Sequence, residues 1–122
     1  MPADMNKASI LVIAGLVVLH ALYGLAGLAG AVETTFETPQ MILMLLVDVL
    51  VLYGLYYAQA WSWWLLFFGS IYGVIHNIAT MLQGATPQTF VFLLLNLILL
   101  GALTKRETID EYRPNLTYIT GW

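Results

Sequence analysis

The sequence contains no cysteine and few charged residues. Without cysteine the chain cannot form a disulfide, offer a thiolate to a metal or use a thiol as a nucleophile. Lys, Arg, Asp and Glu make up 9% of the 122 residues, against roughly 25% in soluble domains. The four basic residues form no stripe that could neutralise nucleic-acid phosphates. Nucleic acid is therefore excluded as a partner.

Hydrophobic residues, by contrast, make up 61% of the chain, and the mean hydropathy is +0.84. A helix that crosses a bilayer needs about 20 predominantly apolar residues. Four segments meet this requirement: 8–30, 40–58, 61–82 and 88–104. We predict an all-α fold, a four-transmembrane-helix antiparallel bundle over residues 1–104 in contact with the lipid bilayer, followed by a cytoplasmic tail over 105–122.

The segments between the apolar runs have the composition of loops. The stretches VETTFETPQ (32–40) and QGATPQT (83–89) combine Thr, Pro and Gly or acidic residues, and Pro39 and Pro87 stand where helices begin. Only Ala58, Gln59 and Ala60 separate the second and third segments, which suits an antiparallel hairpin. The second and third helices are therefore expected to be neighbours.

The basic residues lie at one end of the predicted bundle. They are Lys7 before the first helix and Lys105, Arg106 and Arg113 after the fourth. Basic residues that flank spans favour the cytoplasmic side. We therefore expect a multi-pass protein of the cell membrane with both termini in the cytoplasm, and with Glu33 and Glu37 in an outer loop.

Five polar side chains interrupt the apolar runs. Ionisable groups inside a span are costly and usually face the interior of a bundle. Counting residues from the predicted boundaries places at least one polar residue of each helix in a common middle band. We take these residues as an intramembrane polar cluster: His20, Asp48, His76, Asn77 and Asn96.

Two helices also carry small residues on one face. Residues three and four apart share a side of a helix, so His20 lies beside one set of glycines and His76 beside another. Such surfaces let a neighbouring backbone approach closely, and we expect both imidazoles to face protein. The helix-packing glycines are Gly24 and Gly27 in the first helix and Gly69 and Gly73 in the third.

Several functions remain open for these residues. The favoured interpretation is a non-catalytic accessory or structural subunit of a larger membrane complex, with the polar groups used for interhelical hydrogen bonds. One alternative is a small transporter or proton-conducting protein that uses Asp48 with His20 and His76. Another is a redox subunit in which His20 and His76 bind a b-type haem. A metal site from the same three residues has suitable ligands but no spacing motif. No metal site, other cofactor or enzymatic activity is expected.

The segment after the fourth apolar run, KRETIDEYRPNLTYITGW (105–122), mixes charges with isolated aromatic residues. It has too few apolar positions to form a core of its own, and such an end is expected to fray unless something holds it. We expect a partner subunit, or else the membrane surface, to do so.

Two stretches resemble a pattern found in small, uncharacterised prokaryotic four-helix integral membrane proteins. They are DVLVLYGLYYAQAWSWWLLF (48–67) and LLLNLILLGALTKRE (93–107). In those proteins a span ends in YGL, a short turn precedes a W-x-WW start, and an N-L span ends in a charged tail. The resemblance covers the second to fourth helices and implies a fold without implying an activity.

Overall fold

A computed structural model describes residues 6–30 and 37–112, and this part of the chain is entirely helical apart from short turns. The all-α prediction is therefore confirmed. The five helices are α1 (Ala8–Leu28), α2 (Thr38–Tyr56), α3 (Ala60–Gln83), α4 (Pro87–Leu103) and α5 (Arg106–Tyr112).

Local sequence determines where several helices begin and end. Glu37 and Gln40 form a capping box at the start of α2, where Pro39 occupies the first turn. The α2–α3 turn is a Schellman motif in which Gln59 N donates to Gly54 O over 2.8 Å. Ala58 takes the left-handed position of this motif, with φ 55°, where glycine is the usual residue.

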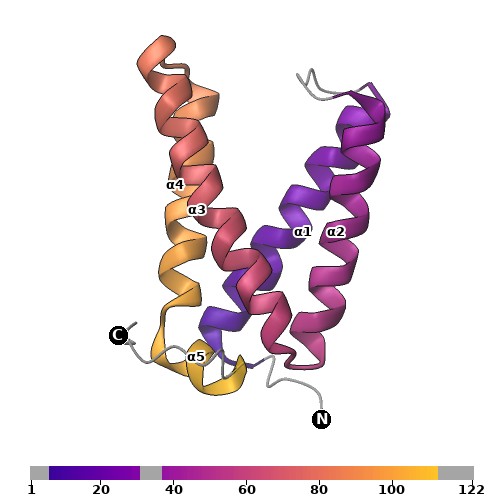
Figure 1. Cartoon of the computed structure of the whole chain (residues 1–122), viewed down its shortest axis with the longest axis vertical. Helices are drawn as coiled ribbons and strands as arrows, with labels where there is room; N and C mark the ends of the chain where they lie inside the picture. Colours follow the sequence, from indigo (N-terminus) through magenta and orange to yellow (C-terminus); the bar gives the residue numbers. More distant parts are fainter. Residues whose placement is uncertain (1–5, 31–36, 113–122) are drawn as a thin grey trace.

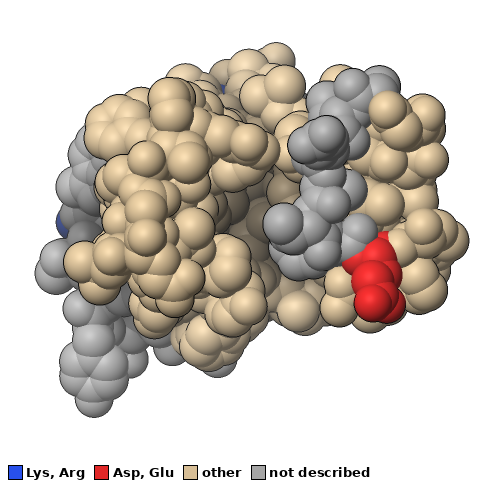
Figure 2. Space-filling view, turned by 90° about the horizontal axis from the view of Figure 1, so that it is seen from above, with Lys and Arg blue, Asp and Glu red and all other residues tan. Residues whose placement is uncertain are grey.

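The helices form two antiparallel pairs that together have the shape of a V (Figure 1). The α1–α2 pair is one arm and the α3–α4 pair is the other. The arms meet at the end that holds the α2–α3 turn and α5, called here the closed end. They diverge toward the opposite end, called here the open end, where α1 connects to α2 and α3 to α4 (Figure 1). Viewed from the open end, the surface is hollowed between the arms (Figure 2).

Three helices, α1, α2 and α3, are long and apolar enough to cross a membrane. The count rises to four if α4 and α5, which are bent by 65° at the break between them, are taken as one span. The composition thus indicates a membrane-spanning protein. The 17 residues of α4 alone extend about 26 Å, at about 1.5 Å per residue.

The well-packed core lies at the closed end. Trp63, Leu103 and Tyr112 are almost fully buried there, together with Ile10, Ile13 and Leu55 from the first two helices. Elsewhere the helices expose large apolar side chains, as expected of surfaces that face lipid. The closed end therefore holds the two arms together.

Candidate functional site

The main polar contact inside the apolar part of the molecule joins α1 to α2. His20 Nδ1 lies 2.7 Å from Asp48 Oδ2, a distance typical of a charge-assisted hydrogen bond. The Asp48 side chain is 14% exposed and the His20 side chain 51% exposed. The structure thus brings together two of the five predicted polar residues and leaves the imidazole half uncovered.

Both residues belong to the inward faces of their helices. On α1, His20 follows the buried Ile13 and Val17 at spacings of seven and three residues, and so continues their stripe. On α2, Asp48 precedes the buried Val51 and Leu55 by three and seven residues. His20 thus continues a core-facing stripe yet is half exposed.

His76 does not join this pair. Its ring stacks on Tyr72 of the preceding turn, with centroids 5.8 Å apart and planes at 11°, and the residue is exposed. The expectation that His76 faces protein is therefore wrong within this chain. Among the described residues there is no group of three or more His, Asp or Glu side chains placed to hold a metal ion.

The two asparagines bond within their own helices at the α3–α4 contact. Asn77 Nδ2 donates to Gly73 O over 2.7 Å, and Asn96 Nδ2 donates to Phe92 O over 2.8 Å. The Asn96 amide also packs directly onto Gly73, since a Cβ at that glycine would lie 2.7 Å from Asn96 Cγ. Gly73 is thus required for the close approach of α4 to α3.

The other predicted packing glycines have different surroundings. A Cβ on Gly24 would make ordinary contacts with Leu45 at 3.5 Å, whereas a Cβ on Gly69 would meet no atom within 4 Å. Gly27 is in the last turn of α1 and is partly buried. Of the two glycines predicted on α3, Gly73 is covered by α4 and Gly69 is left open.

A second polar cluster, which the sequence reasoning missed, attaches α5 to the start of α1. Ser9 N donates to Glu107 Oε1 over 2.9 Å, and Lys7 Nζ pairs with Glu111 Oε2 at 3.0 Å. Thr108 Oγ1, fully buried, lies 2.7 Å from Ser9 Oγ and 2.8 Å from the Ala102 carbonyl oxygen. We call α5 with these contacts the α5 clamp.

One aromatic side chain extends the contacts of the α5 clamp to α2. Tyr112 donates its hydroxyl to Leu55 O over 2.7 Å, so α5 contacts α1, α2 and α4. Burial, with a smaller contribution from Glu111, raises the pKa of Tyr112 to about 12. The hydrogen bonds from Ser9 lower the pKa of Glu107. Residues 106–112 are thus held by the chain itself, and the rest of the predicted tail, 113–122, lies outside the described residues.

The signal for the clamp is weak in the sequence. Thr108 and Tyr112 are four residues apart and so share one face of a helix. A buried helix face is usually recognised by apolar residues at this spacing, whereas these two side chains carry hydroxyl groups. Trp63 adds a similar contact, donating its indole N–H to Leu103 O over 2.9 Å. Each of these groups joins elements that lie far apart in the sequence.

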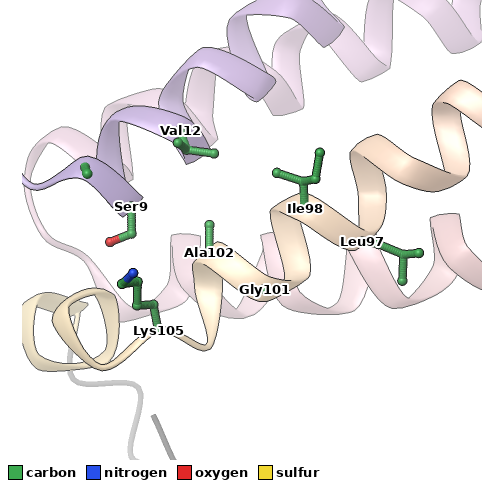
Figure 3. Close-up of a pocket in the computed structure, with 8 residues that line it drawn as sticks. Ser9, Val12, Leu97, Ile98, Gly101, Ala102 and Lys105 are labelled. Carbon is green, nitrogen blue, oxygen red and sulfur yellow. The ribbon is translucent and has the colours of Figure 1, made fainter. Parts of the chain in front are cut away.

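A groove of about 480 Å³ follows the contact between α1 and α4 near the closed end. Val12 and Ile98 face it from opposite sides, and Ser9 and Lys105 lie toward α5 (Figure 3). Its remaining lining is formed by Ala8, Leu97, Gly101 and Ala102. The lining is mostly hydrocarbon, so the groove suits an apolar group better than a polar substrate.

Comparisons of the chain with protein-family models, with curated proteins and with solved structures found no match.

Proposed function

We propose that this chain is a multi-pass subunit of a larger membrane-protein complex, with α1 to α4 each crossing the bilayer. Three basic residues of the described chain, Lys7, Lys105 and Arg106, lie at the closed end, while Glu37 immediately precedes α2 at the open end. Basic residues favour the cytoplasmic side, so the closed end is placed in the cytoplasm and α5 at its membrane surface.

The observation that carries the subunit proposal is the uncovered face of α3 around Gly69. This glycine exposes helix backbone with open space beside it, and His76, seven residues later on the same side, is exposed as well. A helix of another subunit could approach the backbone at Gly69, as small residues allow in membranes. The same helix would cover the imidazole, which is costly to leave in hydrocarbon.

Purification in mild detergent from the native membrane tests the proposal. We expect a fixed partner to co-purify with the wild-type chain. The partner should be lost in a Gly69→Leu variant, because the leucine side chain fills the space beside the backbone that the partner helix would contact. Gly15→Leu is the matched control, because Gly15 is an exposed glycine of α1 with the same open space beside it. Recovery of the chain alone, or equal partner loss in both variants, would refute the proposed interface.

The absence of cysteine makes orientation testable with single introduced thiols. Gly84, in the exposed α3–α4 turn, has open space around it, and Gln59 is exposed in the α2–α3 turn at the other end. In intact cells an impermeant maleimide is expected to label Gly84→Cys, whereas Gln59→Cys is labelled only after the membrane is opened. The reverse pattern would invert the proposed topology.

A further inference from the structure

The His20–Asp48 pair lies on the faces of α1 and α2 that pack against the other arm nearer the closed end. Both residues continue stripes that belong to the buried core at that end. Leu19 and Val49, the immediate neighbours of the pair, are 56% and 62% exposed. Since successive helical residues point about 100° apart, these neighbours point to other sides of their helices than the pair does.

The arms diverge toward the open end (Figure 1). The space-filling view from that end shows a hollow between the arms (Figure 2). On the α1–α4 side, Tyr23 reaches from one arm to the other: Gln88 Nε2 donates to Tyr23 OH over 2.9 Å, and the Tyr23 ring meets Phe92 edge-on at 5.4 Å. At the closed end Trp63, Leu103 and Tyr112 are almost fully buried.

We propose that His20 and Asp48 form a proton-binding site that exchanges with water at the open end. The inference rests on the membrane-spanning part of the proposed function. One proton enters from bulk water, converts the carboxylate to the acid or the imidazole to imidazolium, and returns to the same water.

The side chains nearest the site from other positions are a phenol, an amide and a phenyl ring. On α1, Tyr23 lies one turn toward the open end, and from α4 the nearest side chains toward Tyr23 are Gln88 and Phe92. Besides tyrosine, His76 is the only ionisable residue of α3, and it lies on an exposed face. Helix α4 has no ionisable residue. Within the described helices, the ionisable partner of His20 is therefore Asp48.

Water access is tested by thiol reactivity in the full chain in native membranes. A charged, impermeant thiol reagent added on the open-end side is expected to modify His20→Cys at least about tenfold faster than Leu19→Cys, because the reactive thiolate forms where water solvates it. Asp48→Cys and Val49→Cys form a second matched comparison, which keeps the test valid if one variant does not fold. Equal rates within both pairs, or faster reaction from the closed-end side, would overturn the proposal.

Proton binding itself is tested by infrared difference spectra of the wild-type chain in lipid vesicles at two pH values. A titrating carboxyl or imidazole band is expected, and it should be absent from Asp48→Asn and shifted in His20→Gln. A spectrum that Asp48→Asn leaves unchanged would overturn the assignment even if the hollow admits water. Failure of the membrane topology itself would appear separately, as wrong-side labelling of Gly84→Cys and Gln59→Cys.

Discussion

Replacing Thr108 by valine is expected to weaken the α5 clamp without changing its shape. Thr108 is fully buried, and its hydroxyl lies within hydrogen-bond distance of Ser9 Oγ and of the Ala102 carbonyl oxygen. Valine keeps the branched outline of threonine and removes only the polar group. The variant therefore isolates the hydrogen bonds of the clamp from its packing.

The magnitude follows from the two partners that remain. Ser9 is 5% exposed and Ala102 is 9% exposed, so neither oxygen gains a full replacement from water. A buried polar group that loses its partner costs about 1–3 kcal/mol, and with two such groups partly re-paired we expect a loss of about 2–3 kcal/mol. That loss corresponds to a rise of roughly 30- to 140-fold in the unfolding equilibrium constant, at about 1.4 kcal/mol per factor of ten.

Equilibrium unfolding of the purified chain in mixed micelles measures this difference, with helix content and tryptophan fluorescence as independent probes. The matched control is Thr80→Val, because the Thr80 hydroxyl donates to His76 O within its own helix. Its effect should stay within about 0.5 kcal/mol, as for surface substitutions generally. Equal losses in the two variants would show that the buried hydroxyl of Thr108 does not stabilise the clamp.

Three further predictions follow from particular contacts. Gly73→Ala places a Cβ against the Asn96 amide and should destabilise the chain by about 1–3 kcal/mol through overpacking. Thermal unfolding should show this loss, no loss or a gain of stability in Gly69→Ala, and recovery of stability when Asn96→Ala is added to Gly73→Ala. Hydrogen bonds from Ser9 lower the pKa of Glu107 below its ordinary 4.5. The ionised Glu107 therefore stabilises the fold fully above pH 4.5, and this contribution is lost as the pH falls through the lower pKa of the folded state. The pH dependence of unfolding in acid should be weaker in Glu107→Gln, and identical curves for the two proteins would contradict this prediction. Ala58→Gly relieves a left-handed residue with φ 55° and should raise the free energy of unfolding by up to about 1 kcal/mol; an unchanged or lower unfolding midpoint in denaturant would count against this strain.

The apolar spans were predictable because hydrocarbon length and turn composition are encoded locally. The short α2–α3 connection follows directly from the three residues between the apolar runs, 58–60. Helix α5 was not predictable in the same way, since seven residues of mixed charge are too few to form a stable helix alone. Its contacts reach Ser9, 98 residues away along the chain, and no local pattern reports such a separation.

The polar residues show the same limit. Their depth follows from residue counting, which placed His20 and Asp48 in one band, but their pairing depends on how α1 and α2 rotate against each other. The glycine pattern of α3 predicted a face that packs, and at Gly73 the structure places the Asn96 amide there. His76 was assigned to the same interior because spacing alone cannot tell a glycine covered by a neighbour from one left open.

The position of the α5 clamp also determines when the molecule can close during synthesis. Lys7 and Ser9 emerge from the ribosome before the rest of α1, and the residues that bind them, Glu107 and Glu111, are made about a hundred residues later. Until then the first turn of α1 lacks its contacts with α5. The α1–α2 arm can already assemble at that stage, since domains fold from the N-terminus onward during synthesis. A chain released before Arg106 would carry α1 to α4 and still lack the contacts that join α5 to the first turn of α1.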